Sequence, residues 1–382
     1  MRPLLVAYRA LGLGDLLTAV PALRALARAF PEHRRVLAAP VALEPLALLI
    51  GAVDEVAGTG DGKRAPPPLP ARLRGAVVVV NLHGRGPASH ARIRESGARR
   101  VIAFADPAAS VPGGPAWDEP EHEVRRWCRM LSEHGIPADP GDLDLVPPPW
   151  PVPAGAAGAV LVHPGAAEEA RRWPAQRWAA VARAIDAPVA VTGDGSERRL
   201  AEEVSGGEWP VLAGRTDLRG LAAAVSAARL VICGDTGVAH LATAFGTPSV
   251  VLFGPTDPAV WGPPPDRARR HHAIWKGETG NPHGSNPDPG LLEIGVPEVL
   301  ARVGLLVKVN PMDTIQEVPK MSVTDKLTGR VKKAAGDLLD NPSLRREGSK
   351  EERKGEAKEE LDRAQDKTAR KAQEVADLER RT

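Results

Sequence analysis

The segment that most constrains the fold is residues 230–258, LVICGDTGVAHLATAFGTPSVVLFGPTDP. It reads as a short apolar strand, a Gly-Asp-Thr-Gly turn, a helix of small residues and a second apolar strand. This order predicts a βαβ unit, because two neighbouring parallel strands need a crossover that is usually a helix. The turn then lies at the carboxyl end of its strand, where open α/β sheets bind ligands. Free N–H groups at the start of the helix favour an anion there, such as a phosphate.

Two interpretations are open for Asp235 and Thr236 in this turn. Either side chain is a suitable N-cap for the helix, which is a purely structural role. His240 follows Thr236 by one helical turn, lies on the same face and is predicted to point toward the crevice. A cap needs no histidine at that place, so the segment also predicts a binding site.

The same segment closely resembles the donor site of glycosyltransferase family 9, the heptosyltransferases, whose pattern is D-[ST]-G-x-x-H followed by [FY]-G-x-T-x-P. The matching positions are Asp235, Thr236, Gly237, His240, Gly254, Thr256 and Pro258. The resemblance implies an α/β chain with a GT-B fold, in which two Rossmann-like domains face each other across a cleft. It also implies an inverting, metal-independent enzyme. Such an enzyme moves heptose or a related sugar from a nucleotide-diphosphate-sugar to a glycan or glycolipid acceptor.

Composition divides the chain near residue 303. Every aromatic residue lies before residue 304: all 8 tryptophans, the single tyrosine and all 4 phenylalanines. The same part of the chain has only two lysines, Lys63 and Lys276. The remainder is rich in lysine and has no aromatic residue. We therefore expect an acceptor domain at 1–150, a donor domain at 151–303 and a linker at 304–320. The proline-rich run 147–153 predicts the hinge between the domains.

The last segment, residues 321–382, is a different kind of polypeptide. From Met321 onward the text MSVTDKLTGRVKKAAGDLLDNPSLRREGSK resembles a CsbD-like stress-response domain, over about residues 321–377. Its few apolar side chains are not enough to offset the cost of ordering the chain. A charged helical or disordered tail is the expectation.

Charge and cysteine content limit the classes of protein. The formal net charge is only +2, which argues against a nucleic-acid-binding protein. Cys128 and Cys233 are predicted to be buried free thiols of a reducing compartment. The N-terminus lacks a signal-peptide pattern and no window reaches 18 uninterrupted apolar residues, so we expect a cytoplasmic protein without a transmembrane segment. The expected partners are a nucleotide-sugar donor and a glycan or glycolipid acceptor, with the inner membrane surface as one place for that acceptor.

The N-terminal segment carries the predicted catalytic base. An apolar strand over residues 3–8 is interrupted at Arg9 and followed by ALGLGD and a helix over residues 16–30. The third glycine of a G-x-G-x-x-G dinucleotide motif would fall on Leu17, which argues against a nicotinamide dehydrogenase. Family 9 has a Gly-Asp pair here, and the resemblance assigns the base to Asp15 and the acceptor side to Gly14. The structural alternative for Asp15 is an N-cap.

Basic residues near position 171 are predicted to contact the donor phosphates. RRWP resembles the family element [KR]-x-W-P, in which Arg171 has the better spacing to Trp173 and Arg172 is the alternative. A solvated pair of arginines is less favoured, because positive charge is unfavourable at a helix N-terminus unless an anion is also present. The full set of expected donor-binding residues is Arg171, Arg172, Gly193, Glu197, Asp235, Thr236, Gly237, Val238 and His240.

The acceptor side is predicted from the run VVVVNLHGR, which is typical of a strand buried on both faces. The family usually has an aspartate, a glutamine and a serine around this loop, so Asn81 and His83 are departures. The acceptor-side candidates are Gly14, Asn81, His83, Arg85 and Ser89. No D-x-D pair follows a strand, so no metal is expected, and no cofactor beyond the co-substrate, for which ADP-heptose is one candidate.

Other elements are predicted from the apolar pattern alone. Strands are expected at 36–39, 76–82, 101–104, 159–162 and 189–192, helices at 121–135 and 175–185, and a loop over 262–289.

Two further functions remain open at this stage. A GT-B-like sugar-nucleotide epimerase would exchange a stereocentre of the donor without an acceptor. A non-catalytic nucleotide-sugar-binding or stress-associated protein would need no base. The presence of Asp15, Asp235 and His240 favours catalysis. In the glycosyl transfer that the resemblance implies, Asp15 takes the proton of the acceptor. Arg171 and the start of the helix at Gly237 hold the leaving diphosphate.

Overall fold

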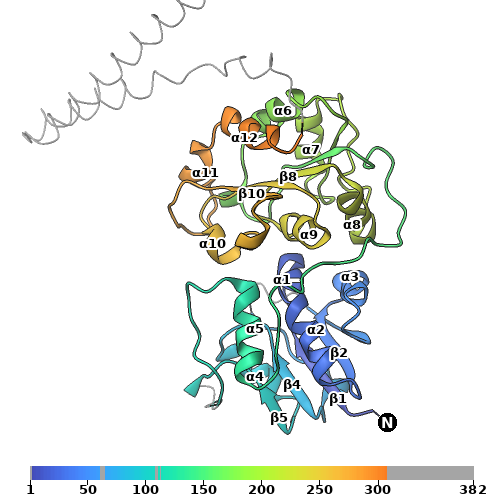
Figure 1. The fold of residues 1–382 in the computed structure, drawn as a ribbon, viewed down its shortest axis with the longest axis vertical. Helices are drawn as coiled ribbons and strands as arrows, with labels where there is room; N and C mark the ends of the chain where they lie inside the picture. The colour runs from blue at the N-terminus through green and yellow to red at the C-terminus, as the bar shows by residue number, and fades with distance from the viewer. Residues whose placement is uncertain (1, 61–64, 108–110, 112, 308–382) are drawn as a thin grey trace, which may run out of the picture. The chain divides into compact units, whose positions relative to one another are not determined.

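The computed structural model describes residues 2–60, 65–107, 111 and 113–307. Residues 308–320 of the expected linker and the CsbD-like tail lie outside the described residues. Within them, the chain forms two five-stranded parallel sheets with helices packed on them (Figure 1). The two sheets belong to one compact unit. Two Rossmann-like halves, as predicted from the sequence, are therefore present.

The first sheet has the strand order β3-β2-β1-β4-β5. Its strands are β1 (Leu4–Tyr8), β2 (Arg34–Pro40), β3 (Glu55–Thr59), β4 (Val78–Asn81) and β5 (Arg100–Ile102). The helical elements of this half are α1 (Leu13–Thr18), α2 (Val20–Ala29), η1 (Val41–Leu43), α3 (Glu44–Leu49), η2 (Ala71–Leu73), α4 (Ala88–Arg94) and α5 (Glu123–Glu133). All four residues of β4 are buried, because helices cover both faces of a parallel sheet.

The second sheet has the order β10-β9-β8-β6-β7. Its strands are β6 (Val160–His163), β7 (Val189–Val191), β8 (Leu230–Gly234), β9 (Ser249–Leu252) and β10 (His271–Ile274). The helical elements are η4 (Glu169–Arg171), α6 (Ala175–Arg183), α7 (Arg198–Ser205), α8 (Leu218–Ala227), α9 (Gly237–Phe245), α10 (Pro258–Trp261), η5 (Pro265–Arg267), α11 (Pro289–Glu293) and α12 (Val296–Gly304). The predicted β8-α9-β9 unit is confirmed, and the two strands pair in parallel.

Three features differ from the sequence-based expectations. The single helix expected over 16–30 is divided into α1 and α2, with a proline in the first turn of α2. Strand β3 was not expected, and β10 lies within a stretch predicted to be a loop. The second half also continues past the expected boundary at 303, because Val307 is 4% exposed and lies in the hydrophobic cluster of that half.

The two halves contact each other directly through α1 and α9 (Figure 1). Gly14 and Gly237 are the positions of closest approach. A Cβ atom added to Gly14 would lie 2.8 Å from Cδ2 of His240, and one added to Gly237 would lie 2.8 Å from Cβ of Leu13. One hydrophobic cluster therefore runs from α1 to α9. The first turns of these two helices are held against each other by packing.

Polar contacts add to this interface between the halves. His122, the N-cap of α5, has its Nε2 atom 3.0 Å from the carbonyl oxygen of Gly262. The chain that leaves the first half also bonds to α9, since the Leu145 N–H donates to the carbonyl of Ala244 at 2.8 Å. The residues before the proline-rich hinge are thus already attached to the second half.

The cysteines are placed as predicted, since Cys128 and Cys233 are both buried and free. None of the helices in the described residues has the length and apolar character needed to cross a membrane.

Candidate functional site

Most of the predicted site residues lie at the two switch points of the sheets, and Gly193 and Glu197 follow the neighbouring strand β7. In each sheet the strand order reverses beside the first strand of that half, between β1 and β4 and between β6 and β8. Loops that leave neighbouring strands in opposite directions open a crevice at such a place, and ligands bind there. Asp15 follows β1 and His83 follows β4, while Arg171 follows β6 and Asp235 follows β8. All four loops belong to the carboxyl ends of their strands.

Asp15 lies in the first turn of α1, and its side chain is 25% exposed. Gly12 is the N-cap residue of α1, so the alternative that Asp15 is the N-cap is wrong. Asp15 is the third residue of the helix, and its Oδ2 atom accepts the Gly12 N–H at 3.2 Å. Oδ1 lies 3.2 Å from Nη2 of Arg9. Burial raises the pKa of Asp15 above its usual value, and the charge of Arg9 opposes that rise. The hydrogen bond to Gly12 and the proposed role as base are compatible, because a quarter of the Asp15 side chain stays exposed.

A buried ionic cluster supports Asp15, and the sequence did not reveal it. Arg9, whose side chain is 1% exposed, uses Nη2 to contact Asp15, the Thr18 hydroxyl at 3.1 Å and Oε1 of Glu123 at 3.1 Å. Glu123 also accepts from Trp127 Nε1 at 2.9 Å and from Arg126. The one available signal was an arginine directly after an otherwise apolar strand, where a buried charge needs a partner.

The acceptor-side candidates of the β4 loop have mixed surroundings. Asn81 and Ser89 are buried, and Asn81 Nδ2 donates to Oγ of Ser89 and to the Gly84 carbonyl, both at 3.0 Å. These two side chains thus build the loop itself. His83 accepts the Ala10 N–H at Nδ1, at 3.2 Å, and burial lowers its pKa to about 4. The neutral ring then carries its proton on Nε2 and offers a hydrogen-bond donor. Arg85 is exposed and paired with Glu119.

The start of α9 forms the opposite side of the site. Thr236 is the N-cap of this helix, but no side chain caps it. The first N–H groups of a helix lack intrahelical partners, so the amides from Gly237 and Val238 are suited to an anion. Asp235 is 3% exposed and does not act as the cap either. Its carboxylate lies 4.0 Å from Arg171 Nη1, and burial raises its pKa, while Arg171, Thr256 and Trp261 oppose that rise.

Arg171 and Arg172 differ in what their guanidinium groups contact. Arg171 Nη1 donates to the Asp235 carbonyl at 3.2 Å, so the side chain lies beside the turn that precedes α9. Arg172 donates from Nε to the Ala166 carbonyl at 2.9 Å and is paired with Glu169. Of the two arginines, Arg171 is therefore the one whose guanidinium adjoins the turn before α9, and its contact with donor phosphates stays a prediction.

Gly193 and Glu197 lie in the loop that follows the neighbouring strand β7, and Glu197 is the N-cap residue of α7. The Glu197 side chain covers Gly165 so closely that an added Cβ atom there would lie 2.1 Å from its carboxylate carbon. Oε2 of Glu197 accepts the Asp194 N–H at 2.9 Å and lies 4.0 Å from Nε2 of His163. Burial lowers the pKa of His163, in spite of the nearby carboxylates. These contacts shape the loop after β6, from which Arg171 extends.

His240 is enclosed rather than open to a crevice. It is 8% exposed, and its ring centroid lies 4.9 Å from that of Trp261 in an edge-to-face arrangement. Burial lowers its pKa to about 4. The neutral imidazole packs against Gly14, so the histidine of the donor motif and the glycine of the Gly-Asp pair touch each other. Trp261 was not singled out from the sequence.

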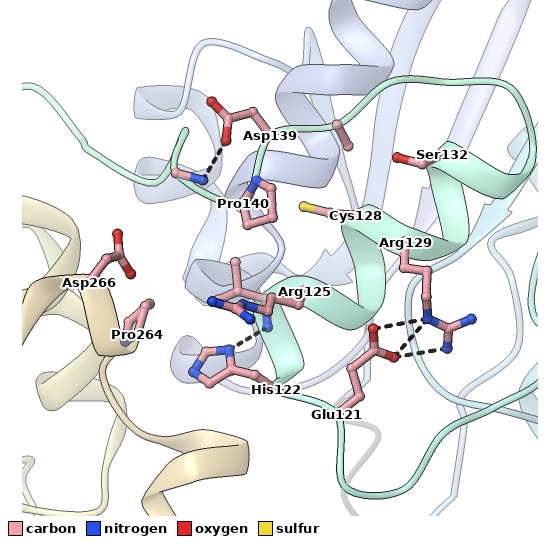
Figure 2. Close-up of a pocket in the computed structure, with 13 residues that line it drawn as sticks. Glu121, His122, Arg125, Cys128, Arg129, Ser132, Asp139, Pro140, Pro264 and Asp266 are labelled. Atoms are coloured by element: carbon pink, nitrogen blue, oxygen red, sulfur yellow. Dashed lines mark hydrogen bonds and ion pairs between the residues drawn. The ribbon is translucent and has the colours of Figure 1, made fainter.

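A cavity of about 570 Å³ lies beside this interface, between α5, the loop over residues 138–141 and Pro264 and Asp266 (Figure 2). Its lining includes Glu121, Arg125 and Asp139 from the first half and Pro264 and Asp266 from the second. Figure 2 shows the Glu121 carboxylate bound by Arg129 and the Asp139 carboxylate bound to a backbone N–H. None of the predicted site residues lines this cavity. In the described part of the chain, no group of three or more His, Cys, Asp or Glu side chains is arranged to hold a metal ion.

Comparisons with known proteins agree with this arrangement. Residues 149–282 match the family model of glycosyltransferase family 9 (heptosyltransferase). Lipopolysaccharide heptosyltransferase 1 of Pseudomonas aeruginosa is 30% identical over 156 residues, which are 38% of this chain and 43% of that protein. The aligned part thus spans less than half the length of this relative. The match to the family model lies in the half that contains β8, α9 and β9.

Solved structures extend the likeness to both halves. A glycosyl transferase family 9 protein from Veillonella parvula has a TM-score of 0.63 at 19% identity, covering 80% of this chain and 97% of that one. The Escherichia coli ADP-heptose lipopolysaccharide heptosyltransferase II has a TM-score of 0.61 at 20% identity, covering 79% and 98%. These likenesses establish the fold, so the predicted GT-B class is confirmed.

Proposed function

We propose that the chain is an inverting glycosyltransferase that moves heptose, or a closely related sugar, from a nucleotide-diphosphate-sugar to a glycolipid acceptor. The observation that carries the proposal is the contact between the first turns of α1 and α9. Leu13 packs on Gly237 and Gly14 packs on His240, so the turn that holds Asp15 adjoins the helix start suited to a diphosphate. The proposed type of reaction, glycosyl transfer, is taken from the match of residues 149–282 to the family model.

In this reaction the acceptor hydroxyl attacks the anomeric carbon on the face opposite the leaving group. Its proton passes to the Asp15 carboxylate, a C–O bond to the acceptor forms, and the bond from the anomeric carbon to the phosphate oxygen breaks. The electron pair of that bond leaves with the nucleoside diphosphate. Arg171 and the amides at Gly237 and Val238 stabilise the negative charge that develops there. Asp235 orients Arg171, which lies beside it.

The donor and acceptor are proposed from the relatives. The Escherichia coli structure is named for ADP-heptose and the Pseudomonas relative for lipopolysaccharide, so ADP-heptose and a lipopolysaccharide-type glycolipid are the first pair to test. The epimerase and the non-catalytic interpretation are not favoured, because the named sequence relatives are heptosyltransferases. A cytoplasmic site of action and the CsbD-like assignment of residues 321–377 belong to the same proposal and rest on the sequence alone.

The test is to incubate the full chain with ADP-heptose, with and without a lipopolysaccharide-core acceptor, and to follow the phosphorus NMR signals of ADP. Slow acceptor-free hydrolysis and faster ADP release with acceptor are expected. Asp15→Asn should lower turnover by about two to four orders of magnitude, the range for losing a general base, while calorimetric ADP affinity is unchanged. No ADP binding and no release from a panel of nucleotide-sugars would refute the proposal. A loss of ADP affinity as large as the loss of turnover would refute the role of Asp15.

A further inference from the structure

The Arg9 side chain is shared between two carboxylates that differ in exposure. Its Nη2 atom lies 3.2 Å from Oδ1 of Asp15 and 3.1 Å from Oε1 of Glu123. The Glu123 side chain is 10% exposed and that of Asp15 is 25% exposed. Two further contacts hold the Arg9 guanidinium in place. Its Nε donates to the Asp15 carbonyl at 2.5 Å, and its Cζ lies 4.8 Å from the centre of the Trp127 ring. The buried Arg9 guanidinium is therefore held between the buried carboxylate of Glu123 and the partly exposed carboxylate of Asp15.

The other ionisable groups around Asp15 leave this pair dominant. From α5, Arg126 binds Glu123 on its second oxygen, and His122 caps the helix with its pKa lowered by burial. From α9, His240 is neutral at ordinary pH because burial lowers its pKa to about 4. From the β4 loop, His83 is neutral for the same reason. The charges that act on Asp15 are thus those of Arg9, which lowers its pKa, and of Glu123, which raises it.

We propose that Arg9 is a positioning residue that orients the Asp15 carboxylate, and that Glu123 sets how strongly Arg9 holds it by competing for the same guanidinium nitrogen. The proposal rests on the proposed function for its catalytic meaning, because Asp15 is the base of that reaction. Neither Arg9 nor Glu123 touches substrate in this scheme. Both act through the carboxylate of Asp15.

The direction of each effect follows from charge. A neighbouring cation favours the ionised carboxylate and lowers its pKa, whereas a neighbouring anion raises it. Glu123 stays ionised although it is buried, because Arg9 and Arg126 hold its pKa below the usual value. Removing Arg9 should therefore raise the pKa of Asp15, and removing the charge of Glu123 should lower it. A catalytic base is active only when ionised, so the acidic limb of the pH–rate profile must move in the same directions.

The experiment compares full-length Arg9→Met, Arg9→Lys and Glu123→Gln with the unmodified protein. Arg9→Met should move the acidic limb of kcat/KM for ADP-heptose up by about 1 to 2 pH units, the range for a carboxylate that loses a close arginine. Glu123→Gln should move it down by roughly 0.5 to 1 unit. Arg9→Lys keeps the positive charge, so its acidic limb should lie close to that of the unmodified protein. Arg24→Met is the matched control, because Arg24 is a half-buried arginine paired with Asp142 and does not contact Asp15.

A second measurement separates this proposal from the proposed function. Asp carboxyl carbons are labelled with ¹³C, the Asp15 signal is assigned from its absence in Asp15→Asn, and its pKa is read by NMR without substrate. Opposite shifts in Arg9→Met and Glu123→Gln support the pair even if no sugar is transferred, in which case only the proposed function fails. If sugar is transferred but neither the Asp15 pKa nor the acidic limb moves, Arg9 is only a structural residue and the inference is overturned. Shifts of the same sign in both variants overturn it as well.

Discussion

Replacing Gly14 with alanine tests the contact that brings the two halves of the site together. A Cβ atom at this position lies 2.8 Å from Cδ2 of His240 and 3.4 Å from Cζ2 of Trp261. His240 is 8% exposed, so its ring has little room to turn away. Overpacking a filled site costs about 1 to 3 kcal/mol, and exchanging glycine for alanine in a helix returns up to about 1 kcal/mol. We expect the free energy of unfolding to fall by about 1 to 2 kcal/mol.

Urea denaturation followed by tryptophan fluorescence measures this change. Gly195→Ala is the control, because a Cβ atom at Gly195 has no heavy atom within 4 Å. The double variant Gly14→Ala/His240→Ala removes the ring that the new methyl group meets. Its loss of stability should therefore be smaller than the sum of the two single losses, by about 1 kcal/mol. If Gly14→Ala is as stable as Gly195→Ala, or if the two single losses simply add, α1 and α9 do not meet through Gly14 and His240.

Three further outcomes are expected. Arg171→Ala should weaken ADP binding by about 1.5 to 3 kcal/mol in calorimetry, and Arg172→Ala by less, because Arg172 is already paired with Glu169; the reverse order would assign the phosphate contact to Arg172. Burial lowers the pKa of His240 to about 4, so up to about 3 kcal/mol of stability should be lost as the pH falls from about 6.5 through 4. His240→Gln should reduce that acid dependence in urea titrations at successive pH values, and an unchanged dependence would contradict the burial of this ring. Ending the chain after residue 303 should lower the melting temperature more than ending it after residue 307, because Val307 lies in the second core; equal melting would show that Val307 adds nothing.

The strands could be predicted where a strand coincides with a continuous run of apolar residues in the sequence. The segment LVICG is buried at every position as β8, and VVVN likewise as β4. Strand β10, with the sequence HHAI, has no such run. His271 is buried there because Nδ1 lies 2.9 Å from Oγ of Ser249 on the neighbouring strand. That hydrogen bond depends on the sheet already being formed, so a pattern within one segment could not indicate it.

The candidate site divides in the same way. Asp15, Arg171 and Asp235 were predicted because each belongs to a short motif whose spacing is visible in one segment, and their catalytic and binding roles remain predictions. Glu123 was not predicted, because its contact with Arg9 joins residues 114 positions apart. The burial of His240 was also missed. Helical spacing predicted that the ring points toward a crevice, but Gly14 of the first half and Trp261 of α10 cover it.

The glycines of the two motifs acquire a physical explanation from this contact. Gly14 precedes the proposed base, and Gly237 begins the helix proposed to hold the diphosphate. Each faces a side chain of the opposite half, His240 on Gly14 and Leu13 on Gly237. Neither glycine has the positive φ angle that would call for glycine on backbone grounds. A larger residue at either position would therefore push apart the two first turns that the proposed reaction brings together. The glycines of both motifs thus lie at the junction of the halves, and the turn with the proposed base adjoins the proposed anion site because the two helices pack closely there.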